Sequence, residues 1–341
     1  MSAAFRRLAA ELYAREAELL SLMIYGTLSA RTGIERAMRE ALGRTEWPVT
    51  WIDGASCDGA ALAGLQAFAV SGRPVTRVRL GNRVVGSVFE DGDARHCLLG
   101  GLGPTATGLL PAAQVQQTLG NLEWALGRVD FKLSDVVRTW FYNEDILAWY
   151  DEFNRVRSAY YAHVPFSTGS LPASTGISAR NPDGAALVVA AWATQPLART
   201  AYAKEIGSPL QCPAPAYGSS FSRAMELRSG GYRRLFVSGT ASIFPDGTTA
   251  WVNDGAKQVA LTMEVVTAIL QSRVMDYCDV TRATAYFKNP IYKGHFDSWC
   301  AARELTHWPV VALQADICRD DLLFEIELDA VVPAAPLAVT R

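Results

Sequence analysis

Two acidic residues within one short apolar stretch are the first candidates for chemistry. Glu325 and Glu327 lie in the run 322–328, whose other members are all apolar. This composition predicts a β-strand, in which residues two apart share one face. A carboxyl group beside apolar walls or a second carboxylate has a raised pKa, and such a group can donate a proton near neutral pH. The residues alone also allow this face to be solvated or to pair with an arginine.

Two arginines are candidates for holding the carboxylates of an anionic ligand, because a guanidinium can grip a carboxylate through two parallel hydrogen bonds. Tyr150 lies seven residues before Arg157, two turns of a predicted helix, so the two side chains share one face. The alternative for Arg157 is a surface charge beside Arg155. Arg223 follows a stretch rich in proline and serine, where we expect a loop, and loops often carry binding residues. Tyr217, six residues earlier, would add a hydroxyl donor.

The elements that position these residues come from an internal repeat. The segments 94–193 and 234–330 share one order of a β-like stretch, a helix, a short strand, a second helix and two closing β-like runs. This order predicts an α+β fold in which one module, a mixed β-sheet packed by helices, is used twice. We expect an N-terminal region at 1–75, a first module at 76–200, and a linker with a second module at 201–341. The N-terminal region matches neither module well and is predicted to open with an amphipathic helix over 2–22.

Alignment of the two copies separates the carboxylates from the rest of the repeat. Glu325 aligns with Val188 and Glu327 with Ala190, so both acids occur only in the second copy. Two arginines, by contrast, are shared: Arg138 and Arg282 occupy equivalent positions. We interpret this shared pair as structural.

The composition excludes several classes of protein. The chain has 341 residues and is half apolar and 19% charged. Its net charge is -2, so electrostatic attraction does not predict binding to nucleic acid or to an anionic membrane. Its six cysteines are scattered, as in a reduced, cytoplasmic protein. No apolar run reaches the length of about 18 residues that spans a membrane. We find no dinucleotide fingerprint, phosphate-binding loop or metal-ligand cluster, and therefore expect neither cofactor nor metal.

Several short sequence motifs resemble those of known protein families. The motifs LFVSG at 235–239 and FEIE at 324–327 are similar to motifs of the small proteins with the RidA/YjgF fold. The arginine that imine-deaminating members of that family carry on the penultimate strand is absent, since Pro309 or Val310 stands there. Two such modules behind an N-terminal region, with WYDEFNRVR at 149–157 and YGSSFSRA at 217–224, resemble the chorismatases. That resemblance implies release of pyruvate from chorismate.

The resemblance also implies roles for the candidate residues. Chorismate is a dianion, so its two carboxylates must be held, its enol ether methylene must be protonated, and the resulting cation must be captured by water or by the neighbouring hydroxyl. The resemblance favours Glu325 as the acid. It makes Tyr150, Arg157, Tyr217 and Arg223 the substrate-binding residues.

The product depends on smaller pocket residues. Cys318 is expected at the end of the strand opposite Glu325. A cysteine at this position resembles the chorismatases that make 3-hydroxybenzoate, whereas a valine there marks the chorismatases that hydrolyse chorismate. Ala241 is less decisive, because the former group tends to have glycine nearby. The preferred product is 3-hydroxybenzoate, and the alternatives are a 3,4-dihydroxycyclohexadiene carboxylate or 4-hydroxybenzoate. An alternative of another class is a non-catalytic RidA-like protein that binds a metabolite. We expect a monomer or a small homo-oligomer.

Overall fold

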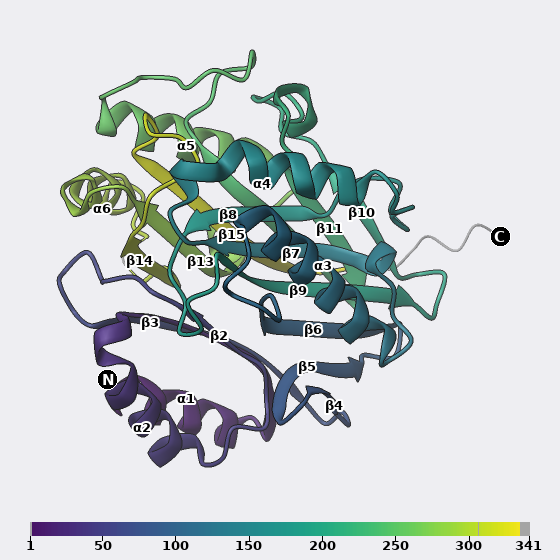
Figure 1. Ribbon diagram of the computed structural model, residues 1–341. Helices are drawn as coiled ribbons and strands as arrows, with labels where there is room; N and C mark the ends of the chain where they lie inside the picture. The colour runs from purple at the N-terminus through teal and green to yellow at the C-terminus, as the bar shows by residue number, and fades with distance from the viewer. Residues whose placement is uncertain (1, 306, 335–341) are drawn as a thin grey trace.

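The computed structural model describes residues 2–305 and 307–334, so the outermost residues of the predicted first and last domains, 1 and 335–341, lie outside the described part. The described residues form three open sheets, two of six strands and one of three. Helices cover the outer faces of the sheets (Figure 1). The inner faces of the sheets therefore meet in the middle of the molecule.

The first module is a six-stranded sheet covered by two helices. Its elements are β4 (Thr76–Leu80), β5 (Arg83–Glu90), β6 (Ala94–Leu102), α3 (Pro111–Gly127), β7 (Val136–Asn143), α4 (Ile146–Tyr161), β8 (Ala173–Ser178) and β9 (Leu187–Pro196). The strand order is β4-β5-β6-β9-β7-β8, with β7 and β8 parallel. Helix α3 buries Val115, Leu119, Leu122 and Leu126, a stripe at helical spacing, against the sheet.

The second module repeats this arrangement. Its elements are β10 (Tyr202–Ile206), β11 (Ala224–Ser229), β12 (Tyr232–Ala241), α5 (Gly255–Gln271), β13 (Val280–Phe287), α6 (Lys293–Ala301), β14 (Val310–Gln314) and β15 (Phe324–Pro333). The strand order, β10-β11-β12-β15-β13-β14, matches that of the first sheet position by position. The predicted α+β fold with one module used twice is confirmed.

The N-terminal region is a shortened third copy of the same module. It contains α1 (Ser2–Ala14), β1 (Ala17–Gly26), α2 (Arg31–Leu42), β2 (Val49–Ile52) and β3 (Leu62–Ser71). Strand β1 is parallel to β2 and antiparallel to β3, the pattern of β7 with β8 and β9. The expectation that this region matches neither module is therefore wrong. It lacks only the strands that open the two complete modules.

The predicted helix over 2–22 does begin at Ser2, but its predicted end is wrong, because the helix ends at Ala14 and a strand begins at Ala17. Glu16 has a φ of 47°, a left-handed conformation that breaks the helix between them. The apolar run of β1 is buried on both faces, as the central strand of its sheet. Periodicity cannot distinguish such a strand from a buried helix.

The three units share one central core. Tyr25, Tyr142 and Tyr286 are completely buried in it and occupy equivalent positions on β1, β7 and β13. Strand register shows the equivalence, since Tyr142 pairs with Val188 and Tyr286 with Glu325. The domain limits at 75/76 and 200/201 stay a prediction.

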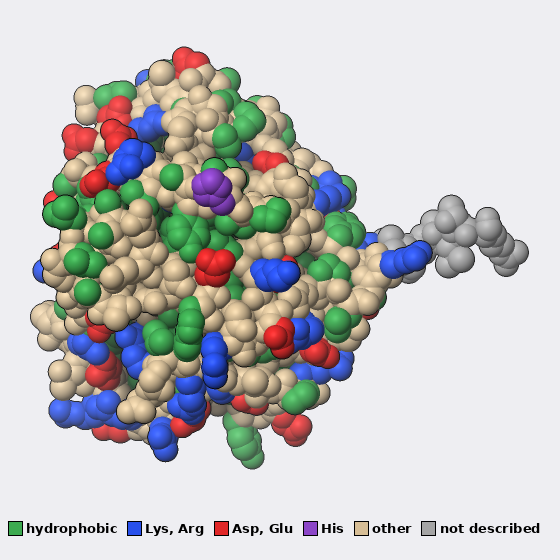
Figure 2. Space-filling view, turned by 45° about the vertical axis from the view of Figure 1, so that its right-hand side comes forward, with side chains coloured by type: hydrophobic (Ala, Val, Ile, Leu, Met, Phe, Trp, Pro, Cys, Tyr) green, Lys and Arg blue, Asp and Glu red, His purple; other side chains and the backbone are tan. Residues whose placement is uncertain are grey.

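Charged side chains of both signs are mixed over the lower part of the surface, where α1 and α2 lie (Figures 1 and 2). Ion pairs such as Arg31–Glu35 and Arg79–Glu46 join them. Among residues 2–305 and 307–334, no helix is long and apolar enough to cross a membrane.

Candidate active site

One cavity between the two modules collects all of the predicted site residues. It has a volume of about 40 Å³. The predicted residues that line it are Tyr150, Arg157, Tyr217, Arg223, Ala241, Cys318 and Glu325. Helix α4 and strand β8 of the first module form one wall. The opposite wall comes from the second module and from the proline-rich segment that joins the modules.

Glu325 projects into this cavity from β15, a strand flanked by β12 and β13. It pairs with Ala241 on one side and Tyr286 on the other. Its side chain is 5% exposed, and within the described residues it makes neither a hydrogen bond nor an ion pair. Burial raises the pKa of Glu325 from 4.5 to about 8, and the negative charge of Glu327 adds to this increase. The carboxyl group is therefore largely protonated at neutral pH.

Glu327 lies two residues further on the same face, but it is ionised. Arg138 of the first module and Arg282 of the second module both pair with its carboxylate, the latter at 2.7 Å between Nη2 and Oε1. Trp140 and Thr175 donate further hydrogen bonds to it. Burial alone would raise the pKa of Glu327, but the two guanidinium groups outweigh burial and hold that pKa below its usual value. Arginine pairing, which the sequence left open, therefore applies to Glu327.

Gly239 of β12 makes room for the Glu325 carboxyl group. A β-carbon added to Gly239 would lie 2.0 Å from Oε1 of Glu325, far inside contact distance. The register between β12 and β15 shifts between Val237 and Thr240, so Gly239 sits at an irregularity in the sheet. Sequence reasoning missed this residue. A glycine inside a predicted strand was the available signal, because such a glycine often marks a bulge or a close approach.

Arg157 and Arg223 bring two buried positive charges to the cavity. Arg157 is 2% exposed and its Nη2 donates to Asn154 at 2.7 Å, while its guanidinium lies over the ring of Phe153. Arg223 is 3% exposed and its Nε donates to the carbonyl oxygen of Cys212 at 3.0 Å. Among the described residues, neither arginine has a carboxylate within ion-pair distance. Nε of Arg157 and Nη2 of Arg223 are also buried without a hydrogen-bond partner.

Such an arrangement is costly for the protein alone, since a buried charge requires a partner of opposite sign. The cavity is therefore electrostatically prepared for an anion with two negative groups. A proton donor, Glu325, faces the same space.

The two tyrosines lie at the edge of the cavity. Tyr150 belongs to α4, and its hydroxyl oxygen is 3.2 Å from Oγ of Ser219. Tyr217 ends a short 3-10 helix, Ala214–Tyr217, and its ring lies under the guanidinium of Arg223 at 5.3 Å. Burial raises the pKa of Tyr217 to about 12, so its hydroxyl remains a hydrogen-bond donor at neutral pH.

Cys318 lies in the loop between β14 and β15, which corrects its predicted place at the end of a strand. Strand β14 already ends at Gln314, and the chain then turns before it enters β15. Burial raises the pKa of the Cys318 thiol to about 12, and the charge of Glu325 contributes in the same direction. The thiol is therefore neutral and forms part of the cavity wall.

An open groove adjoins the cavity on its outer side. It has a volume of about 850 Å³ and shares Tyr150, Tyr217, Cys318 and Arg319 with the cavity. These four residues therefore separate the buried space around Glu325 from solvent.

No metal-binding group stands out in the part of the chain that the structure describes. No set of three or more histidine, cysteine, aspartate or glutamate side chains there could hold a metal ion. The groups that can bind a ligand in the cavity are the arginines, the tyrosines and Glu325.

Comparison with known proteins gives two informative similarities. No model of a known protein family matches the chain. It is 28% identical over 225 residues to a 3-hydroxybenzoate synthase of Streptomyces hygroscopicus, a match that covers 58% of this chain and 64% of that relative. The match thus spans slightly less than two thirds of the relative's length.

Among solved structures, a crystal structure of a chorismatase covers 92% of both chains with a TM-score of 0.67 and 21% sequence identity. The shorter protein YJGH matches 38% of this chain and 97% of its own length, with a TM-score of 0.32 and 22% identity. The structural match shows that this chain has the fold of that chorismatase over nearly its whole length.

Proposed function

We propose that this protein converts chorismate to 3-hydroxybenzoate and pyruvate. The observation that carries this proposal is that a buried, unpaired Glu325 lines the same cavity as Arg157 and Arg223, which have no acidic partner among the described residues. The relative named 3-hydroxybenzoate synthase supports this product.

Each step of the reaction has a group of the right type in the cavity. The two arginines bind the two carboxylates of chorismate, and Tyr150 and Tyr217 supply hydroxyl donors beside them. Glu325 protonates the methylene carbon of the enolpyruvyl ether, which produces a cation at the ether carbon. The neighbouring ring hydroxyl captures this cation and loses its proton, which gives a cyclic ketal. Pyruvate leaves with the former hydroxyl oxygen as the ring carbon–oxygen bond at that position and the ketal bond to the ether oxygen break. The ether oxygen stays on the ring and takes up the proton that the hydroxyl lost, and the ring carbon that bears it loses a proton as the ring becomes aromatic. The two products contain the same atoms as chorismate, so that proton restores Glu325.

Capture by water is the competing outcome, and it would produce a dihydroxycyclohexadiene carboxylate. Capture inside the substrate is favoured because Glu325 is buried and Tyr150, Tyr217, Cys318 and Arg319 separate the space around it from solvent. Ala241 pairs with Glu325 across the β12–β15 ladder, and its methyl group is a small side chain in the cavity wall next to Glu325. Formation of 4-hydroxybenzoate is the remaining alternative.

Substrate entry requires the cavity to open. Its volume of about 40 Å³ is far below the ~300–1,000 Å³ typical of small-molecule sites. Helix α4 is joined to the segment 217–220 by the contacts Tyr150–Ser219 and Ser158–Ser220. Trp149 interrupts α4 with a φ of -148° and a ψ of 20°. We expect the first turn of α4 to move about this kink and to connect the cavity with the adjoining groove.

A protein that only binds a metabolite is the alternative of another class. A binder of a dianion needs the two arginines, but it gains nothing from a carboxyl group held protonated beside them. Glu325 therefore favours catalysis.

The test is to mix the purified protein with chorismate and to follow pyruvate, with chromatography of the aromatic product. We expect pyruvate and 3-hydroxybenzoate in equal amounts, without added cofactor and in the presence of a chelator. Chorismate that is bound but not consumed would contradict the proposal and favour the binder. The cytoplasmic location and the monomeric or small oligomeric state stay predictions.

A further inference from the structure

A second cavity lies where the three units of the fold meet. Its volume is about 460 Å³, and it shares no lining residue with the cavity around Glu325. Strand β3 of the N-terminal region, strands β5, β6 and β9 of the first module, and strands β11, β12 and β15 of the second module line it. The proposed reaction uses none of these residues.

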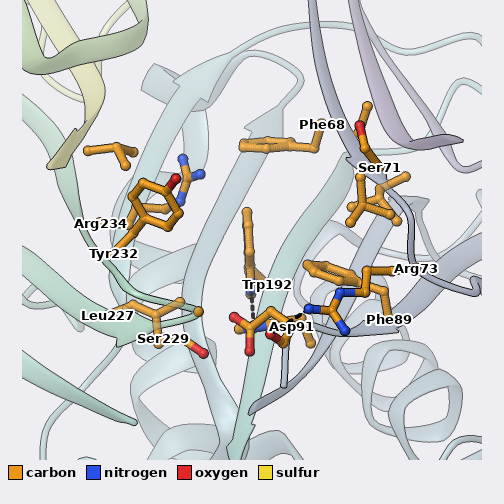
Figure 3. Close-up of a pocket in the computed structure, with 16 residues that line it drawn as sticks. Phe68, Ser71, Arg73, Phe89, Asp91, Trp192, Leu227, Ser229, Tyr232 and Arg234 are labelled. Carbon is orange, nitrogen blue, oxygen red and sulfur yellow. Dashed lines mark hydrogen bonds and ion pairs between the residues drawn. The ribbon is translucent and has the colours of Figure 1, made fainter. Parts of the chain in front are cut away.

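The interior of this second cavity is aromatic. Phe68, Phe89 and Trp192 line it. Trp192 lies in the middle, between Tyr232 on one side and Phe89 on the other (Figure 3). Phe68 meets Trp192 edge to face, with ring centroids 5.2 Å apart. Aromatic rings in this arrangement offer both faces and edges to a planar ligand.

A chain of hydrogen bonds holds Trp192 in place. Its Nε1 donates to Nδ1 of His96 at 3.3 Å, and Nε2 of His96 lies 2.9 Å from Asp91 Oδ2. The other oxygen of Asp91 accepts from the backbone amides of Asp93 and Ala94. The indole is therefore oriented before any ligand arrives, which reduces the entropy that binding would cost.

Two arginines face this aromatic interior from opposite sides, Arg234 beside Tyr232 and Arg73 beside Phe89 (Figure 3). Arg234 lies over the ring of Trp192 at 5.3 Å, and its side chain is 26% exposed. Its nearest carboxylate, that of Asp329, is 3.8 Å away, beyond hydrogen-bond distance.

Neither guanidinium is fully neutralised. Asp329 is also paired with Arg282, at 3.4 Å, so Arg234 shares the one acidic side chain with which it pairs among the described residues. Arg73 donates to the backbone carbonyl of Asp91 and pairs with no carboxylate within the described residues. Asp91 also lines the cavity, where its hydrogen bonds with His96 and two backbone amides occupy its oxygens but leave its negative charge in place.

We infer that this second cavity binds a small aromatic monocarboxylate, a molecule of the size and charge of benzoate. The ring packs against Phe68 and Trp192, and the carboxylate pairs with Arg234. A second negative charge on the ligand would approach Asp91, so a monoanion fits better than a dianion. The volume of the cavity lies within the ~300–1,000 Å³ of small-molecule sites.

The experiment uses benzoate as the probe and measures its binding by calorimetry. Arg157 and Arg223 could also bind benzoate, so the measurements are made on the full chain with the changes Arg157→Ala and Arg223→Ala. In this background we expect one molecule of benzoate per chain. Adding Arg234→Gln should weaken binding at least about tenfold, since a charge-assisted hydrogen bond contributes roughly that much or more. The matched control is Arg199→Gln, which changes an exposed arginine elsewhere and should leave the dissociation constant unchanged.

Two further measurements separate charge from shape. Benzamide, which is isosteric but neutral, should bind at least about tenfold more weakly than benzoate. Ser71→Trp places a large side chain at an exposed position that lines the cavity and should abolish benzoate binding. This variant tests the site independently if the Arg234→Gln protein does not fold. Equal binding of benzoate and benzamide, or unchanged benzoate binding in folded Arg234→Gln or Ser71→Trp protein, would overturn the inference. None of these outcomes depends on turnover of chorismate, so the proposed function stands or fails separately.

Discussion

Glu325 and Glu327 lie two residues apart on the same face of β15, yet the structure shifts their pKa values in opposite directions. The difference comes from their partners, because Arg138 and Arg282 pair with Glu327 and no cation pairs with Glu325 among the described residues. The ionised Glu327 in turn disfavours a second negative charge beside it. One carboxylate therefore helps to keep the other protonated.

Replacement of this proton donor is the most direct test of the mechanism. Glu325→Gln should lower the rate of pyruvate release by about 10²–10⁴-fold, because the amide keeps the size of the side chain but cannot act as an acid. In the unaltered protein the rate should fall as pH rises through about 8, where the carboxyl group loses its proton. A stopped assay of pyruvate across pH 6–10 measures both effects. Near-normal turnover by a folded Glu325→Gln protein would remove Glu325 from the mechanism.

The same carboxyl group should make stability depend on pH. Its pKa in the folded state lies above its unfolded value of 4.5, so the folded state binds more protons between pH 4.5 and about 8. The free energy of unfolding therefore decreases as pH rises through this window. At pH 9, Glu325→Gln should be more stable than the unaltered protein by up to a few kcal/mol, and the difference should vanish near pH 4. Urea denaturation at the two pH values would reveal an equal effect at both if Glu325 were ordinarily ionised.

The two buried arginines should contribute to binding rather than to stability. Arg157→Ala and Arg223→Ala each leave one substrate carboxylate without its partner, a loss of about 1.5–3 kcal/mol or roughly 10–150-fold in kcat/KM. Thermal melting should change little or increase, because each variant removes a buried charge that has no acidic partner among the described residues. Arg155→Ala is the matched control, since Arg155 is exposed on the same helix. An arginine whose loss leaves both kcat and KM unchanged does not bind substrate.

Gly239 should be intolerant of a methyl group. Gly239→Ala places a β-carbon 2.0 Å from the original position of Oε1 of Glu325, so the carboxyl group must move. Because proton transfer depends on placement within fractions of an ångström, we expect kcat to fall by about tenfold or more. Gly294→Ala is a suitable control, since an added β-carbon there meets no atom within 4 Å. If the two variants retain equal activity, the position of Glu325 is less restricted than the structure indicates.

Cys318 should influence which product forms. A change of about 1.4 kcal/mol in the competition between internal capture and capture by water alters the product ratio tenfold. Cys318→Val reshapes the wall next to Glu325 and should shift products toward the dihydroxycyclohexadiene carboxylate, measured by chromatography after complete conversion. An unchanged product ratio, with chorismate still consumed, would show that Cys318 only packs against its neighbours. Selectivity would then have to be sought at Ala241 or Tyr150.

Much of the fold could be read from the sequence because its signals are local. The repeat at 94–193 and 234–330 was visible in the order of helical and strand patterns, and it placed Val188 against Glu325. The structure gives the same pairing, since each residue faces the equivalent tyrosine of the neighbouring strand. The third copy escaped detection because β1 is buried on both faces and shows no alternation of apolar and polar residues.

The sequence likewise showed which residue types are available for chemistry: an acid in an apolar strand, two arginines near tyrosines, and a cysteine that was predicted at the end of a strand. Only the tertiary structure decided which partners these side chains have and which of them are ionised. Arg138 reaches Glu327 across 189 positions of the chain, and no local pattern predicts which of two neighbouring carboxylates receives that partner. The absence of an acidic partner for Arg157 and Arg223 among the described residues, and the space that Gly239 leaves for Glu325, also depend on how the modules pack. Burial and long-range charge set a pKa, and both arise only when distant segments meet.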